Sequence, residues 1–130
     1  MKIVKRLHKG DDLMVSIKQI AEEYNIEAGV VLSSVGCLTK LTVRCADGKT
    51  VHSKSGRFEI LSINGTVSKN RCHLHIAAAD KNLTTYGGHL CEESIVNTTC
   101  ELVIETLDGL VFDKEFDENT GYNELVVKEK

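Results

Sequence analysis

From residue 28 onward the chain alternates between apolar and polar residues, in runs rich in β-branched side chains that stop at Gly, Asn or Asp. This period is typical of β-strands that bury one face, because successive side chains of a strand point to opposite sides. The sequence has no proline, and Asp47-Gly48 and Asp108-Gly109 are hairpin signals. The predicted strands are Ala28–Val35, Leu38–Cys45, Arg57–Val67, Cys72–Ala79, Thr99–Leu107 and Val111–Phe116.

One segment has helical rather than strand periodicity. Between Asp12 and Tyr24, apolar residues recur every three or four positions and polar residues occupy the other side. Asp11 or Asp12 suits the N-cap, since a short carboxylate accepts the free backbone N–H groups of the first turn. A second, short helix is predicted over Glu92–Thr98. The expected fold class is α+β, a mostly antiparallel β-sheet with one or two packed helices.

The length of the chain suits a single domain, so residues 1–130 are expected to fold as one unit. The N-terminal segment turns polar at Gly10 without the apolar stretch of a signal peptide, and no later run is long enough to span a membrane. The five cysteines are odd in number and form no Cys-x-x-Cys pair, which argues against a disulfide framework and against a zinc ribbon. We expect a cytoplasmic protein with reduced thiols and no membrane partner.

Charge and motif content disfavour several classes of function. Sixteen basic against nineteen acidic side chains give a net charge of −3, without a cluster of Lys or Arg. Duplex DNA is bound largely by neutralising its phosphates, so any direct DNA binding is expected to be weak. The sequence contains no Gly-x-Ser-x-Gly elbow, no P-loop and no Gly-x-Gly-x-x-Gly motif, which disfavours serine hydrolases, P-loop NTPases and dinucleotide oxidoreductases.

The segment Cys72–Ala78 places two histidines on one face of a predicted strand. Apolar residues alternate with His73 and His75, and residues two apart on a strand are separated by roughly 6–7 Å, a span across which two side chains can converge on one ion. A third imidazole, His89, follows Gly87-Gly88, where the backbone can approach another element closely. Three imidazoles with a vacant fourth position are the arrangement of catalytic zinc and suit divalent transition metals. The alternative is that these histidines are simply solvated.

Arg57 and Glu59 form a second candidate pair, on the predicted strand that follows Gly56. Phe58 and Ile60 alternate with them and are expected to be the core anchors. In one interpretation the pair faces the same cavity as the histidines, with Glu59 as a catalytic acid or base and Arg57 holding an anionic substrate. In the other interpretation both are structural ion-pair residues of a central strand.

Seven short runs, taken in order, resemble the plants-and-prokaryotes-conserved (PPC) domain. They are Gly10-Asp11-Asp12, Leu32–Gly36, Gly56–Ser62, Gly65-Thr66, His73–Ile76, Gly87–Leu90 and Thr120–Leu125. The resemblance implies a sheet-and-helix domain that assembles as a homotrimer and contacts other proteins through the run Gly56–Leu61. In plants the domain is joined to AT-hook segments in nuclear DNA-binding proteins. This chain lacks the Arg-Gly-Arg-Pro hook and resembles the stand-alone prokaryotic type.

The architecture is also similar to that of acetolactate decarboxylase, whose zinc is held by a His-x-His pair and a later histidine. The matching positions are His73, His75 and His89, so the resemblance implies a zinc site there. Two functions of different class follow. The first is a binding module, associated with DNA or transcription, that works through partners; the second is a small zinc-dependent, lyase-like enzyme acting on a keto or hydroxy acid. Salt-dependent DNA retention would favour the first, and metal-dependent turnover of such acids the second.

Overall fold

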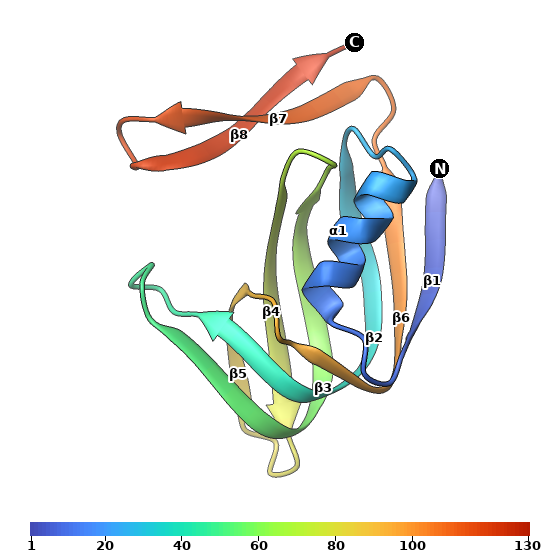
Figure 1. Cartoon of the computed structure of the whole chain (residues 1–130), viewed down its shortest axis with the longest axis vertical. Coiled ribbons are helices and arrows are strands. Elements are labelled where there is room, and N and C mark those ends of the chain that lie inside the picture. Colours follow the sequence, from blue (N-terminus) through green and yellow to red (C-terminus); the bar gives the residue numbers. More distant parts are fainter.

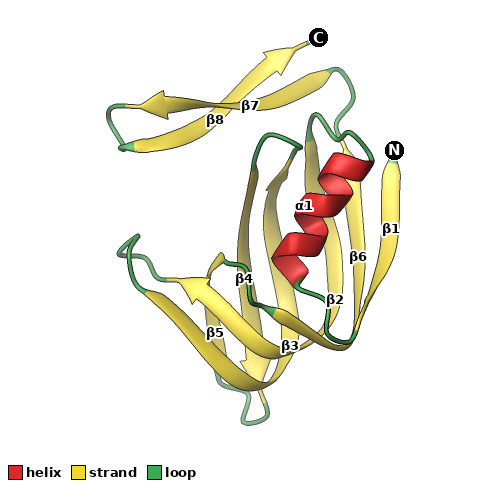
Figure 2. Cartoon of the chain, viewed as in Figure 1, coloured by secondary structure: helices red, strands yellow, loops and turns green.

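The computed structural model describes residues 1–130, with one helix and eight strands in a mostly antiparallel α+β fold (Figure 1). Six strands form one sheet in the order β1-β6-β2-β3-β4-β5, and the last two form a separate hairpin. The helix lies against one face of the large sheet, as Figure 2 shows, and it is too short to cross a membrane. The elements are β1 (Lys2–His8), α1 (Leu13–Glu23), β2 (Gly29–Arg44), β3 (Val51–Val67), β4 (Cys72–Asp80), β5 (Thr85–Leu90), β6 (Ile95–Thr106), β7 (Leu110–Asp117) and β8 (Tyr122–Glu129).

The predicted helix near the N-terminus is confirmed, and Asp12 is its N-cap. The Asp12 carboxylate accepts a hydrogen bond from the backbone N–H of Val15 at 3.1 Å, which satisfies one of the free donors of the first turn. The apolar side of the helix is buried against the sheet through Leu13, Met14, Ile17, Ile20 and Ala21.

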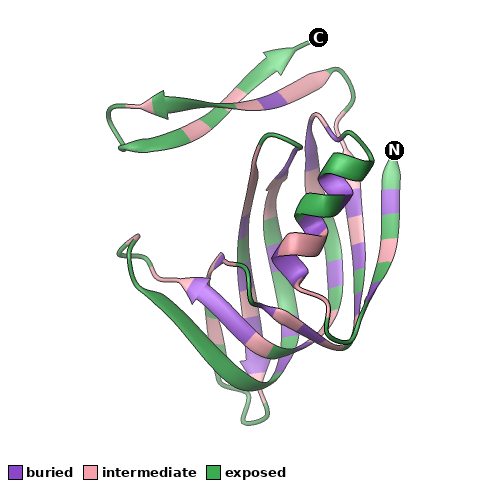
Figure 3. Ribbon diagram, in the orientation of Figure 1, coloured by how far each residue is buried: buried purple, intermediate pink, exposed green.

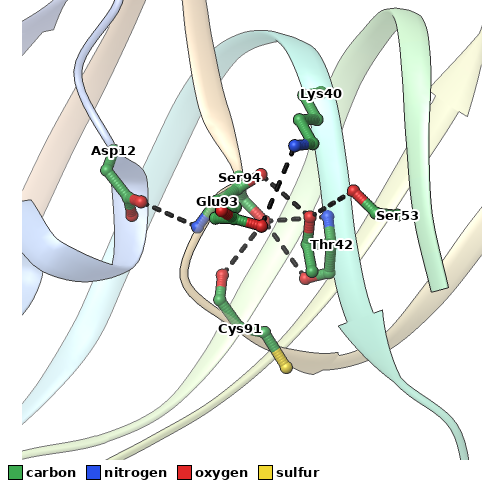
Figure 4. A network of polar contacts seen from close by, with 7 residues as sticks. All are labelled: Asp12, Lys40, Thr42, Ser53, Cys91, Glu93 and Ser94. Atoms are coloured by element: carbon green, nitrogen blue, oxygen red, sulfur yellow. Dashed lines mark hydrogen bonds and ion pairs between the residues drawn. The ribbon is translucent and has the colours of Figure 1, made fainter. Parts of the chain in front are cut away.

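The helix predicted over Glu92–Thr98 is wrong, because this segment begins as a tight connection and continues as β6 from Ile95 onward. Figure 4 shows the polar contacts that hold it. The N–H of Thr42 donates to the hydroxyl of Ser94 at 3.0 Å, and the hydroxyl of Thr42 donates to the carbonyl of Glu93 at 2.8 Å. The N–H of Glu93 donates to Asp12 at 2.7 Å. Since these groups are bonded to β2 and to the helix N-cap, they cannot form a helical ladder.

The predicted strands in the middle of the chain are confirmed in position, with two differences. The runs Ala28–Val35 and Leu38–Cys45 form one continuous strand, β2, because its pairing with β3 and β6 continues past Gly36 through β-bulges. The strands β1, β5 and β8 were not predicted from the sequence. Gly87 and Gly88 lie within β5, where they allow this strand to pack closely against its neighbours. They do not form a turn between two elements.

The two predicted turns form, but only one of them closes a hairpin. Asp47-Gly48 connects the antiparallel strands β2 and β3, as expected. Asp108-Gly109 connects β6 to β7, and these strands belong to different sheets. The second turn therefore redirects the chain toward the β7–β8 hairpin, which lies apart from the main sheet in Figure 1.

The core lies between α1 and the sheet, and the strands alternate between buried and exposed residues along their length (Figure 3). Large side chains that are almost fully buried include Phe58, Leu74 and Leu102. Several large apolar strand residues stay exposed in the single chain, with exposed fractions from 52% to 70%: Val4, Leu32, Val35 and Leu61. The chain therefore has a complete core on the helix side and uncovered apolar surface elsewhere.

Phe58→Ala is expected to destabilise the protein by about 3–5 kcal/mol, the usual cost of removing a buried aromatic side chain. Phe58 is only 1% exposed, and its ring packs edge-to-face on Tyr86 with centroids 6.2 Å apart. The matched control is Glu59→Gln, an exposed neighbour that should change stability by no more than about 0.5 kcal/mol. Urea unfolding at equal chain concentration would measure both. Equal losses for the two variants would show that Glu59 is a structural ion-pair residue.

Candidate metal centre

Two neighbouring strands place the three histidines on the sheet face opposite the helix. On β4, His73 and His75 alternate with Leu74 and Ile76, which are 0% and 4% exposed. β5 runs antiparallel to β4 with His89 directly opposite His75, so these two side chains leave the sheet on the same side. The convergence of His89 with the His-x-His pair is therefore a consequence of strand register.

The three imidazoles are close enough to share one ion. One nitrogen atom from each of His73, His75 and His89 lies within 4.8 Å of the other two. The ring centroids are 5.1 Å, 5.2 Å and 5.8 Å apart. Zinc bound at 2.0–2.1 Å by each nitrogen would need separations of about 3.4 Å in tetrahedral geometry, so small side-chain rotations suffice. The donor set fits a divalent transition metal.

The surroundings of His73 and His89 favour the neutral imidazole, the form that binds metals. Burial lowers the pKa of His89 to about 4, and the nearby Arg44 guanidinium adds to this effect. The pKa of His73 is lowered as well, first by burial and then by Arg71. A lowered histidine pKa means that the neutral ring persists as the pH falls below its ordinary value of 6.5. Neutral rings offer the lone pairs that a metal needs.

Arg71 is hydrogen-bonded to one of the candidate ligands. Its Nη2 lies 3.2 Å from Nδ1 of His73, and because a guanidinium can only donate, Nδ1 accepts and the ring proton is on Nε2. The same Nη2 lies 3.9 Å from a carboxylate oxygen of Glu124 on β8. The Arg71 side chain is only 15% exposed.

Arg44, at the end of β2, is the second cation beside the cluster. It is paired in register with His89 on β5. Its Nε is buried without a hydrogen-bond partner, and so is Nδ1 of His89. The Arg44 guanidinium lies 6.0 Å from the centre of the Tyr122 ring, which belongs to β8. The β7–β8 hairpin thus contributes Tyr122 and Glu124 to the surroundings of the two arginines.

Sequence reasoning gave these four surrounding residues no role, for different reasons. Alternation places Arg71 on the same face as His73, two positions away, but does not show that the two side chains are hydrogen-bonded. Arg44 reaches the cluster only through the pairing of β2 with β5, which joins residues far apart in the sequence. Tyr122 and Glu124 belong to the run Thr120–Leu125, which carried part of the family resemblance but no predicted role.

Arg57 and Glu59 are not brought to the histidines within one chain. Glu59 is exposed and pairs with Ala79 of β4, four residues from His75, which corresponds to about 13 Å along a strand. Arg57 is exposed and two residues farther from the cluster along β3.

Comparison with known proteins identifies a family. The family described as the Plants and Prokaryotes Conserved (PCC) domain matches residues 1–108. Two curated relatives, both named bifunctional protein GlmU and both from Synechococcus strains, are 37% identical over 123 residues, which is 95% of this chain and 20% of theirs. The chain therefore spans a fifth of the length of these relatives.

Solved structures are similar over nearly the whole chain. A hypothetical protein from Salmonella enterica is 30% identical, with a TM-score of 0.97 and coverage of 100% of this chain and 94% of that one. A metal-containing protein from Archaeoglobus fulgidus is 30% identical, with a TM-score of 0.77 and coverage of 97% and 93%. Both have the fold described above.

Two more distant structures agree in fold alone. A candidate DNA-binding protein from Bacteroides thetaiotaomicron is 21% identical, with a TM-score of 0.86. A Staphylococcus aureus protein described as similar to alpha-acetolactate decarboxylase is 17% identical, with a TM-score of 0.50 over 82% of this chain. The family and architectural resemblances inferred from the sequence are thereby confirmed, and the chain belongs to the Plants and Prokaryotes Conserved (PCC) domain family.

Proposed function

We propose that this protein binds one divalent transition metal ion per chain through His73, His75 and His89, and that zinc is the favoured ion. The observation that carries the proposal is the convergence of three ring nitrogens within 4.8 Å on one sheet face. Imidazole donors suit zinc, copper, nickel and iron, whereas calcium and magnesium prefer oxygen ligands. The metal-containing relative from Archaeoglobus fulgidus supports the same reading.

A three-histidine site favours chemistry or ligand binding over a purely structural role. Structural zinc sites are closed by four protein ligands, whereas three ligands leave one coordination position for a substrate. This favours the small lyase-like enzyme, acting on a keto or hydroxy acid, over a DNA-directed module. Lyase chemistry also needs a proton donor or acceptor. Glu124 is better placed for this role than Glu59, because its charge acts to raise the pKa of His73, whereas Glu59 pairs with Ala79, away from the histidines.

Untagged protein supplied with zinc and then dialysed is expected to retain about one ion per chain by elemental analysis. His75→Ala or His89→Ala should weaken zinc binding by more than about 100-fold, since loss of a ligand exceeds the 10–100-fold typical of losing a supporting partner. The control is His8→Ala, an exposed histidine outside the cluster, which should keep full affinity. A metal-free protein after zinc addition would refute the site.

The protein is proposed to act as a homotrimer. Apolar side chains such as Val35 and Leu61 are 58% and 56% exposed in the single chain, and covering them in an interface would favour association by roughly 25 cal/mol per Å² of apolar area. Several of these exposed residues occupy strands of the main sheet, which gives a broad surface rather than isolated contacts.

Light scattering is expected to give a mass three times the 14.3 kDa of the chain. Val35→Lys should shift the protein toward monomer at micromolar concentration, because a charge would be buried in the interface. Leu83→Lys is the matched control, since Leu83 lies in a turn and is 85% exposed. A monomer for the unmodified protein would contradict the proposal.

The second candidate function is binding to DNA or to other proteins. The run Gly56–Leu61 on β3 supports it, because four of its residues are exposed and available to a partner: Gly56, Arg57, Glu59 and Leu61. Direct DNA binding is disfavoured by charge, because the chain carries −3 and a trimer would carry three times that value.

Mobility-shift titration with duplex DNA is therefore expected to show weak or no binding near 0.15 M salt, since the chain has no basic stripe to neutralise phosphates. The same titration at low salt measures the non-specific electrostatic part. Submicromolar, sequence-selective binding at the higher salt would contradict this expectation and favour the DNA-directed function.

A further inference from the structure

We propose that Arg44 and Arg71 form a binding site for a small oxyanion, such as the carboxylate of an organic acid, directly beside the three histidines. The inference rests on the proposed metal site and adds to it the residues that hold the ligand and the charge that the ligand carries. It follows from the hydrogen-bonding state of the two arginines and from the charge balance of the site.

The lone pair of His73 cannot serve Arg71 and a metal ion together. A neutral imidazole has one nitrogen with a free lone pair, and Arg71 occupies it by donating to Nδ1 at 3.2 Å. When His73 binds a cation, one ring nitrogen gives its lone pair to the ion and the other carries the proton. Arg71 must therefore release His73, and its guanidinium is left without that acceptor in a position where only 15% of the side chain is exposed.

Arg44 already lacks an acceptor. Its Nε is buried and makes no hydrogen bond, and a buried unpaired donor on a charged group is costly. The centre of the Tyr122 ring lies 6.0 Å from the guanidinium carbon, and the face of the ring offers no oxygen acceptor. The register pair Arg44–His89 sets this guanidinium beside the cluster, so an anion at the cluster can accept its hydrogen bond.

The charge balance favours an anion once a metal is present. An imidazole that donates its lone pair to a metal is uncharged, so three histidine ligands do not compensate a divalent ion. Glu124, 3.9 Å from Arg71, is the one carboxylate paired with these arginines. A divalent cation, two guanidiniums and one carboxylate leave an excess of three positive charges. An oxyanion reduces this excess and accepts the free N–H groups.

The chemistry of the donors defines the class of ligand. A planar guanidinium matches the paired oxygens of a carboxylate or phosphate. A metal held by His73, His75 and His89 would keep a coordination position open for an oxygen of the same group. The anion would thus be held by Arg44 and Arg71 on one side and by the metal on the other. A neutral amide of the same size lacks the charge on which this binding depends.

The test uses the 130-residue chain loaded with cobalt(II), whose visible absorption changes when a ligand enters the coordination sphere. Lactate and inorganic phosphate are the probes, and lactamide is the uncharged match for lactate. We expect a saturable spectral change with lactate or phosphate and none with lactamide. Arg44→Met and Arg71→Met should each weaken anion binding about tenfold or more, as charge-assisted hydrogen bonds are lost.

The same variants should not weaken metal binding. Removing either positive charge, or the hydrogen bond that occupies His73, should leave cobalt affinity in the absence of anion unchanged or tighter, as measured by competition with a chelator. A merely structural role would weaken both metal and anion binding. Arg6→Met is the matched control, since Arg6 is exposed on β1 and outside the cluster. If a methionine variant unfolds, Arg44→Lys and Arg71→Lys replace it. They keep the positive charge but lose the paired N–H donors of the guanidinium, so they should weaken anion binding less than about tenfold.

Each outcome separates this inference from the metal site. If cobalt binds and neither anion changes the spectrum, or if both arginine variants bind anion like the unmodified protein, the inference is wrong while the metal site stands. Binding of lactamide as tightly as lactate would also refute it, because charge would then play no part. If cobalt does not bind at all, elemental analysis shows it directly, and the metal site fails together with the inference.

Discussion

The geometry of the site depends on the close packing of β5 between β4 and the end of β2. A side chain at Gly87 would place its first carbon 2.8 Å from the carbonyl oxygen of Ile76, and one at Gly88 would place it 2.7 Å from the carbonyl oxygen of Arg44. Both obstacles are backbone atoms, so any larger residue would push β5 away from its neighbours. His89 is the next residue, and its distance from His75 and from Arg44 is set by these two contacts.

This packing also explains why two positively charged arginines lie beside imidazoles that would bind a metal cation. Strand pairing fixes His89 beside Arg44, and alternation on the same face fixes His73 beside Arg71. Burial, and then the nearby positive charges, lower the pKa of His73 and His89. Neutral histidines are good metal ligands, yet the same positive charges repel a cation. The proposed metal and the proposed anion would therefore satisfy a site of this composition best when both are bound.

The part of the fold that depends on local pattern could be predicted from the sequence. Alternation predicted the middle strands, and the 3.6-residue period with Asp11 or Asp12 as the N-cap predicted α1, whose N-cap is Asp12. The connection around Glu93 could not be predicted, because its hydrogen bonds go to Thr42 and Asp12, distant in sequence. β5 was missed for a related reason. Two consecutive glycines are typical of turns, and only the neighbouring backbones make them necessary inside a strand.

The same distinction applies to the site. His73 and His75 could be paired from spacing alone, since both lie on one strand. Their relation to His89 needed the register of β4 and β5, and the relation to Arg44 needed that of β2 and β5. Alternation predicts which face of the sheet Arg57 and Glu59 occupy, but it does not predict how far along that face they lie from the histidines. The β-bulge at Leu61 adds to this limit, since it shifts the face of every residue on one side of it.

Metal binding and anion binding at this site would be thermodynamically linked. If release of Arg71 from His73 accompanies metal binding, and if the freed guanidinium then binds an oxyanion, each ligand stabilises the state that the other prefers. The factor by which metal raises anion affinity must equal the factor by which anion raises metal affinity. Such a site would hold its metal most tightly when the anion is abundant. Metal occupancy and anion concentration would therefore change together, whether the bound anion is turned over or only sensed.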